Sequence, residues 1–193
     1  MSQHTSDHPI LDAAEICFGR HGVRRTTIDD IAAEAGVSRI TVYRQIGNRD
    51  EIVLQALLRV TDRFLVRVRP QLLGCQDLSE ALTELVLATV AAARHGDLLL
   101  LYASADQGAT GRPIPGAPAP LFALYTDTVA LLDTRLPGCL RARTTPAEAG
   151  EWVLRVALSL LTIPPPIPRS HIETATYVRQ ALASGLCEPH DVG

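Results

Sequence analysis

Residues 26–51 read TTIDDIAAEAGVSRITVYRQIGNRDE, and this stretch combines helix-start and helix-stop signals at the spacing of two short helices. Thr27 can cap the first helix, while Asp30 can reach back to the backbone of the cap. Gly36 falls where a helix needs a residue with positive φ just after its last turn. Ser38 can then cap a second helix at once. The stretch therefore predicts two short helices joined by a tight turn.

The second of these helices has two chemically different faces. At about 100° per residue, Val42 and Ile46 fall on one side, which predicts that they face the core. Ile40, Tyr43 and Arg44 fall on the other side. This layout is that of a helix-turn-helix, in which the second helix enters the major groove of DNA.

The rest of the chain predicts further helices and no sheet. Apolar residues make up 47% of the sequence and aromatic residues only 4%, which favours helices. Apolar spacing and capping signals place these helices over residues 49–70, 78–94, 97–102, 121–136, 146–163 and 171–184, with Gly185 as the last C-cap. Residues 107–120 are too rich in Gly and Pro for a helix, so we expect a loop there and a candidate lid over a pocket.

The charge distribution favours a nucleic-acid partner, although the net charge is only -3. Between Arg20 and Arg49, six arginines accompany three acidic residues, which leaves a local charge of +3 and a charge of -6 elsewhere. A basic region on an acidic body suits a protein that meets phosphates at one end.

Several classes of protein are disfavoured. No apolar run approaches the ~20 residues that span a bilayer, and the first residues, MSQHTSDHP, lack the pattern of a secretion signal, so we expect a cytoplasmic protein without a membrane partner. The sequence contains no Gly-x-Ser-x-Gly, no phosphate-binding Gly loop and no firm His-x-x-x-His helix. We therefore expect no enzyme, no catalytic residues and no cofactor.

The four cysteines, Cys17, Cys75, Cys139 and Cys187, lie far apart without a Cys-x-x-Cys pair. Neither a zinc site nor a disulfide framework is expected from this spacing, and no metal is predicted. Cys75 and Cys139 fall in predicted loops, where a redox-sensing thiol is an alternative to an ordinary surface thiol.

These residues together resemble the N-terminal domain of the tetracycline-repressor (TetR) family. The resemblance covers roughly residues 10 to 55, and its combined spacing is far more specific than any single residue. It is carried by Ala14, Phe18 and Gly22, Thr26-Thr27, Ile31-Ala32, Ala35-Gly36-Val37-Ser38, Thr41, Tyr43 and Arg49-Asp50-Glu51.

The resemblance implies an all-helical homodimer in which three N-terminal helices bind DNA. A fourth helix links them to a C-terminal domain, where a small molecule changes the spacing of the two DNA-binding heads. The expected division is a disordered tail over 1–8, the helix-turn-helix domain over 9–48, a connecting helix over 49–70 and a ligand-binding and dimerisation domain over 71–193. The expected function is that of a repressor that binds a palindromic operator and is released by an apolar or amphipathic effector.

The DNA contacts are expected on and around the second helix. Tyr43, Arg44 and Ile40 are placed on base edges, and Arg39 on a base or a nearby phosphate. Backbone contacts are assigned to Thr27, Thr41, Gln45 and Arg49.

The effector and dimer contacts are assigned to the C-terminal part. The effector residues are His95, Leu99, Tyr102, Asp106, Phe122 and Tyr125. The last two predicted helices carry long apolar stripes, and in the family the corresponding pair forms a four-helix bundle with a second subunit. The dimer residues are Trp152, Val156, Leu160, Ile172, Val178 and Leu182. Both sets have an alternative reading, in which these side chains only close the core of a single chain.

Two alternatives to a repressor stay open at this point. The regulator could activate transcription, or the chain could be a helical protein-interaction module that keeps the shape of the DNA-binding head. Ile40, Gln45 and Ile46 stand where Gly, His and Phe are common in the family, which leaves some room for the second alternative.

Overall fold

A computed structural model of the chain describes residues 8–95, 118–163 and 165–187. The described residues form eight helices and no strand, so the predicted all-helical class is confirmed. The chain divides into two compact units, and the division falls within the fourth helix, between Arg63 and Phe64. Residues 1–7 of the predicted tail, the predicted helix over 97–102 and residues 107–117 of the predicted loop lie outside the described residues.

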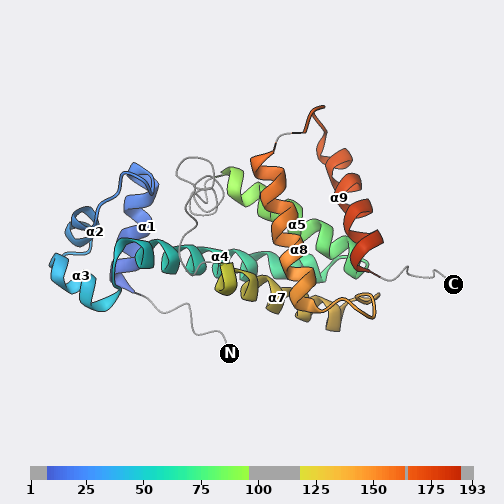
Figure 1. Cartoon of the computed structure of the whole chain (residues 1–193), viewed down its shortest axis with the longest axis horizontal. Coiled ribbons are helices and arrows are strands. Elements are labelled where there is room, and N and C mark those ends of the chain that lie inside the picture. Colours follow the sequence, from blue (N-terminus) through green and yellow to red (C-terminus); the bar gives the residue numbers. More distant parts are fainter. Residues whose placement is uncertain (1–7, 96–117, 164, 188–193) are drawn as a thin grey trace. The chain divides into compact units, whose positions relative to one another are not determined.

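The first unit is built on four helices (Figure 1). They are α1 (Pro9–His21), α2 (Ile28–Glu34), α3 (Arg39–Gln45) and the first part of α4 (Arg49–Leu73). Helix α2 packs against both α1 and α3. Each helix contributes apolar side chains to the core of the unit, including Phe18, Ile31, Val42 and Ile52, all at most 2% exposed. The expected core side of α3 is thus confirmed.

The start of α2 has the predicted capping box. The Thr27 hydroxyl accepts a hydrogen bond from the Asp30 amide at 3.2 Å, and the Asp30 carboxylate accepts one from the Thr27 amide at 2.8 Å. Two of the amides that a helix N-terminus leaves without intrahelical partners are thereby satisfied. The Ser38 hydroxyl caps α3 in the same way, since it accepts from the Thr41 amide at 3.1 Å.

Between α2 and α3 the chain reverses at Gly36, whose φ is +65°. The Val37 amide donates to the Ala32 carbonyl at 3.0 Å and the Gly36 amide to the Ala33 carbonyl at 3.2 Å. These two bonds are those of a Schellman motif, which satisfies the last carbonyls of a helix when the residue after its cap is left-handed. The predicted tight turn, with a positive φ at Gly36, is therefore confirmed.

Helix α4 begins with a reciprocal pairing of Asn48 and Glu51. The Asn48 side chain accepts from the Glu51 amide at 3.1 Å, and the Glu51 carboxylate accepts from the Asn48 amide at 2.6 Å. The expectation that this helix ends at Pro70 was wrong, because it continues to Leu73. Pro70 lies in the last turn, where it removes one backbone donor but does not stop the helix.

The second unit contains the rest of α4 and four further helices. They are α5 (Leu78–His95), α7 (Pro118–Arg135), α8 (Pro146–Thr162) and α9 (His171–Leu186). Thr145 and Glu148 form the capping box of α8, and Ser170 with Glu173 caps α9. Helix α5 packs against both α8 and α9 (Figure 1).

Two predicted helix ends were wrong in this unit. Helix α7 begins at Pro118, not at Leu121, because Pro118 and Pro120 both lie in its first turn, where a missing amide donor costs no intrahelical bond. Helix α9 continues through Gly185 to Leu186, so Gly185 is a helical residue and not a cap.

Candidate nucleic-acid interface

The outer face of α3 is exposed. Ile40 is 77% exposed and Tyr43 43% exposed, and Arg44 is also exposed. On the opposite side Val42 is fully buried and Ile46 is 8% exposed. Because the buried side fixes the helix on α2, the exposed side chains stand on a rigid support.

Arg39 lies at the start of α3 within a small cluster of exposed side chains. Its guanidinium is 3.3 Å from the Asp29 carboxylate and lies over the Tyr43 ring, 5.6 Å from the ring centroid. The hydrogen bond to the Tyr43 hydroxyl, and then the charge of Asp29, raise the pKa of Arg39. Ion pairs as exposed as this one contribute little to stability, so Arg39 can exchange Asp29 for a phosphate at small cost.

Three of the polar residues assigned to the DNA backbone also lie at this surface. The Thr27 hydroxyl donates to the Asp30 carboxylate at 2.7 Å, and the Thr41 and Ser38 hydroxyls are 2.9 Å apart. Both threonines are therefore engaged in caps, whereas Gln45 is exposed. The two caps fix the first turns of α2 and α3. Helix N-termini are favourable places for phosphate groups.

Arg49 is half-buried, and its guanidinium is used inside the unit. It donates to the Val23 carbonyl at 2.5 Å and to the Thr26 carbonyl at 3.4 Å, which ties the start of α4 to the loop between α1 and α2. This geometry gives Arg49 a structural role, and the assignment of this residue to a DNA phosphate gains no support from it.

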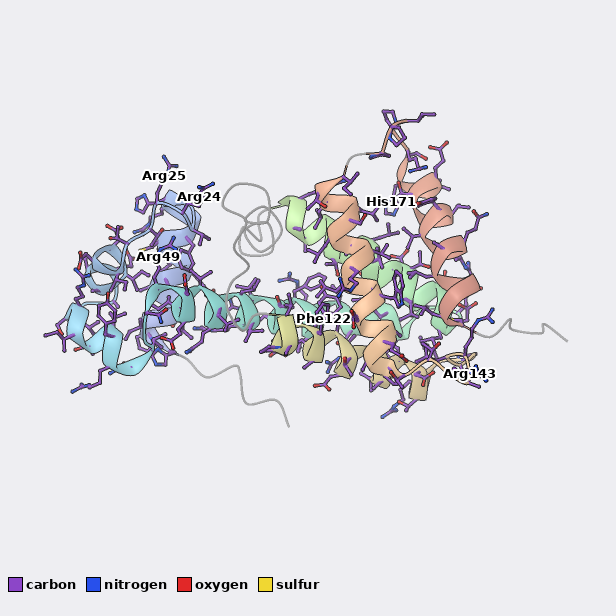
Figure 2. All side chains as sticks on the ribbon, viewed as in Figure 1. Arg24, Arg25, Arg49, Phe122, Arg143 and His171 are labelled. Atoms are coloured by element: carbon purple, nitrogen blue, oxygen red, sulfur yellow. The ribbon has the colours of Figure 1, made fainter. Side chains whose placement is uncertain are left out.

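The same loop carries two exposed arginines that sequence reasoning did not assign to the site. Figure 2 shows Arg24 and Arg25 at the outer edge of the unit, on the loop that Arg49 supports from below. The Arg25 side chain donates to the His21 carbonyl at 2.9 Å. Arg24 and Arg25 are consecutive and lie shortly before the capping box of α2. This pattern favours a phosphate contact, and the assignment from the sequence did not use it.

An ionic cluster holds α1 on α4 beneath this surface. Arg59, whose side chain is 8% exposed, is paired with Asp12 and lies 3.7 Å from the Glu15 carboxylate, and Arg63 is also paired with Glu15. A buried arginine needs such partners, because an unpaired charge in the interior is costly. The cluster therefore fixes the helix from which the α1–α2 loop leaves.

The family model of the bacterial regulatory proteins of the tetR family matches residues 10–56. The chain belongs to the TetR family. Its matched part covers α1 from the second residue of that helix, all of α2 and α3, and the start of α4, and the chain is therefore a helix-turn-helix transcriptional regulator.

Relatives and solved structures agree with this assignment. The uncharacterized HTH-type transcriptional regulator Rv1255c of Mycobacterium tuberculosis is 26% identical over 155 residues, which cover 80% of this chain and 74% of that protein. The regulator TtgR of Pseudomonas putida is 51% identical over 49 residues, 25% of this chain and 23% of its own. The TetR family repressor AlkX of Dietzia sp. strain DQ12-45-1b has the same fold, with a TM-score of 0.64 and 18% identity over 95% of this chain and 97% of that chain.

Of the expected effector residues of this TetR-family protein, the structure describes the side chains of Phe122 and Tyr125. Tyr125 is fully buried, its hydroxyl lies 3.0 Å from that of Thr89, and burial raises its pKa. Phe122 is half-buried beneath the Arg155 guanidinium, 5.6 Å from the ring centroid (Figure 2). Tyr125 is thus a core residue with a satisfied hydroxyl. Leu99, Tyr102, Asp106 and the side chain of His95 lie outside the described residues.

A cavity of about 330 Å³ lies elsewhere in the second unit of the regulator. Its lining comes from α5, α8, α9 and the connection between the last two helices. The lining residues are Leu87, Val90, Ala91, Arg94, Leu160, Pro165, Arg169, His171 and Thr174. Sequence reasoning missed this cavity, because its walls are more than 60 positions apart in the chain and no local motif connects them.

The residues assigned to dimerisation fall into two groups. Trp152 and Ile172 are 55% and 77% exposed, and Val156 and Leu160 are half-buried. Val178 and Leu182 are 0% and 3% exposed, so they are core residues of the single chain and cannot reach a partner. Their assignment was wrong because α9 packs its inner side against α5.

In the part of the chain that the structure describes, no group of three or more His, Cys, Asp or Glu side chains could hold a metal ion. None of the described helices has the length and apolar character that crossing a membrane requires.

Proposed function

We propose that this TetR-family regulator binds a palindromic DNA operator as a homodimer, represses transcription from it and is released by a small amphipathic effector. The observation that carries the proposal is the exposed face of α3, where Ile40, Tyr43 and Arg44 stand opposite a fully buried Val42. A helix with one side locked into a core and the other side free is suited to insertion into a major groove.

In this proposal the side chains of α3 read the bases. Arg44 donates to a guanine edge, Tyr43 contacts a base edge, and Ile40 packs on a thymine methyl group. Arg39 leaves Asp29 for a base or a phosphate.

The backbone contacts come from the polar residues around α3. Thr27, Thr41 and Gln45 contact phosphates, as does Arg24 from the loop before α2. Arg49 is given the role of supporting that loop, in place of a direct contact.

A dimer follows from the size of the reading element. Helix α3 has seven residues, so one copy contacts few base pairs, whereas two copies related by a dyad read half-sites about one helical turn apart. Trp152 and Ile172 supply exposed apolar surface for the contact, with Val156 beside them. These three residues are the interface that we propose, because Leu160 lines the cavity of the second unit.

Release by an effector requires that the effector prefer one conformation of the dimer. A ligand shifts the equilibrium between two states only by the difference between its affinities for them. The proposed effector would therefore favour a separation of the two α3 helices that does not match the half-sites.

The first experiment is selection of bound sequences from random duplex DNA by the full chain, followed by affinity measurements on the selected duplex. Arg44→Ala and Tyr43→Ala should each weaken binding by about 1–3 kcal/mol and relax the preference at particular base pairs. Because both side chains are exposed, the melting temperature should not change. Arg135→Ala, an exposed arginine of the second unit, is the control and should bind as the parent does.

The outcome also separates the two classes of function. A regulator should select a palindrome and lose affinity steeply with salt, since phosphate contacts release counterions. An interaction module would select no sequence, and any residual affinity would be insensitive to salt. Equal binding by the parent and both α3 variants would show that this face does not read DNA.

A further inference from the structure

We infer that the cavity between α5, α8 and α9 is a site for a small amphipathic carboxylate, with Arg94, Arg169 and His171 as the groups that hold its head. The inference rests on the proposed function, because it names the chemical class of the effector and the place where it binds. It differs from the expected effector site in the residues that the structure describes, since neither Phe122 nor Tyr125 lines this cavity.

The floor of the cavity is apolar. Leu87 and Val90 of α5 are 7% and 8% exposed, and Leu160 of α8 and Pro165 are half-buried beside them. These side chains offer hydrocarbon surface to a ligand and no hydrogen-bonding group. A ligand that enters this floor gains free energy from burying its own apolar part.

The mouth of the cavity is cationic. Arg94 and Arg169 are exposed, come from different elements and line the same space, and none of the nine lining residues is acidic. Guanidinium groups bind carboxylates well, because their planar donor pairs match the two carboxylate oxygens. An apolar floor below two guanidinium groups selects a molecule with an apolar body and an anionic head.

Within the described residues, the polar groups near the mouth do not occupy the donors of Arg94 and Arg169. The Thr174 hydroxyl is committed as a donor to the Ser170 carbonyl at 2.9 Å, and Glu173 accepts from the Ser170 amide at 2.7 Å as the cap of α9. Arg169 lies over the Tyr177 ring at 4.4 Å, a contact that uses its face and not its donor edge. His171, the first residue of α9, adds an imidazole donor and is labelled in Figure 2.

The volume limits the size of the ligand. About 330 Å³ is near the lower end of the range of about 300–1,000 Å³ for small-molecule sites. A medium-chain carboxylate is of a suitable size for a site at this end of the range.

The test is calorimetric titration of the full chain without DNA, with sodium octanoate as the probe. Octylamine reverses the charge of the head, octanol removes it, and inorganic phosphate removes the apolar body. We expect saturable binding of octanoate, affinities at least tenfold lower for octanol and phosphate, and no saturable binding of octylamine. Equal affinity for octanol would reduce the site to an apolar groove, and equal affinity for phosphate would reduce it to an anion site. Either result overturns the proposal.

Variants then locate the binding. R94Q and R169Q should each weaken octanoate binding by about tenfold, since each removes one charged partner of the carboxylate. R143Q is the matched control, because Arg143 is also exposed but lies before the first residue of α8, whereas the cavity lies at the last turn of that helix. Both lining arginines are exposed and on separate elements, so loss of folding in one variant leaves the other as the test. Octanoate affinities that equal that of the parent in both variants would overturn the proposal.

Failure of this site and failure of the proposed regulation are distinguishable. The titration contains no DNA, so it tests the cavity alone. Addition of octanoate to the complex with the selected duplex tests release separately. Binding without release supports the cavity and counts against effector control, whereas release that persists in R94Q and R169Q places the effector elsewhere and overturns the proposal.

Discussion

The two units of this regulator differ in how far apart in the sequence their functional residues lie. In the first unit, the residues that define the site lie within residues 26–51 and are positioned by caps and a turn formed by near neighbours. In the second unit, α8 and α9 begin at equally clear caps, but the cavity is assembled from α5, α8 and α9. Local signals therefore fix the starts of the capped helices in both units, and they fix the functional surface only in the first.

The largest expected contrast uses one substitution at two helical glycines. A Cβ atom at Gly150 of α8 would lie 2.8 Å from the Thr126 amide nitrogen of α7, whereas a Cβ atom at Gly19 of α1 would meet nothing within 4 Å. Gly150→Ala should therefore destabilise the chain by about 1–3 kcal/mol through overpacking. Gly19→Ala should stabilise it by about 0.5–1 kcal/mol, because Ala loses less entropy in a helix.

Chemical denaturation of both variants measures this contrast. The expected difference between them is about 1.5–4 kcal/mol in the free energy of unfolding, with opposite signs relative to the parent. A stabilised Gly150→Ala variant would mean that α7 and α8 are not in close backbone contact, and it would remove the tightest long-range packing constraint of the second unit.

The next contrast lies within the first unit and separates a structural arginine from an exposed one. Arg49→Ala removes the donor to the Val23 and Thr26 carbonyls, and we expect a loss of about 1–2 kcal/mol of stability, since hydrogen bonds to charged groups contribute more than neutral ones. Arg24→Ala should leave the melting temperature unchanged. It should instead lower DNA affinity and reduce the slope of log affinity against log salt by about 1.

Thermal melts and salt titrations of the two variants decide between these roles. If Arg49→Ala melted like the parent and flattened the salt slope, Arg49 would be the phosphate contact expected from the sequence, and its two carbonyl contacts would be incidental. Neither substitution changes a residue of the Arg39 cluster. We therefore expect this cluster to stay intact in both variants, which would show that the DNA-binding face is folded.

The fold was predictable from the sequence where short-range chemistry decides it. The capping box at Thr27, the Schellman turn at Gly36 and the box at Thr145 all involve residues at most five positions apart. The errors lie at Pro70, Pro118 and Gly185, where helix-breaking residues occur in terminal turns. Propensity is weak at such positions, because a terminal turn lacks part of its hydrogen bonds in any case.

The candidate sites were predictable to different extents for the same reason. The period of α3 separated Val42 from Tyr43 and Arg44, because burial of one side of a short helix follows from its own spacing. The apolar stripe of α9 did not reveal that Val178 faces α5 instead of a partner, since a stripe shows that a side is buried but not against what. Neither could any spacing reveal that Arg94 and Arg169 share one cavity.

A smaller effect compares the two capping boxes. Thr27→Ala and Thr145→Ala remove the same cap from α2 and α8, and each should cost about 1 kcal/mol of stability. Their functional effects should differ, because α2 supports the DNA-binding face and α8 does not contribute to it. We expect weaker DNA binding only for Thr27→Ala, measured on the selected duplex. Equal loss of affinity in both variants would show that DNA binding depends on the cap of α8 in the second unit as much as on the cap of α2.

The smallest expected effect is the pH dependence of these caps. Hydrogen bonds from Thr27 lower the pKa of Asp30, and hydrogen bonds from Thr145 lower the pKa of Glu148. Each cap therefore stabilises the fold fully above the ordinary carboxyl pKa of about 4, and the stabilisation is lost as the pH falls below that value, because the unfolded chain takes up the proton first. Melting temperatures between pH 6 and pH 3 should fall less steeply for Asp30→Asn and for Glu148→Gln than for the parent. An equal slope in all three proteins would mean that these two caps do not contribute to the acid sensitivity of the fold.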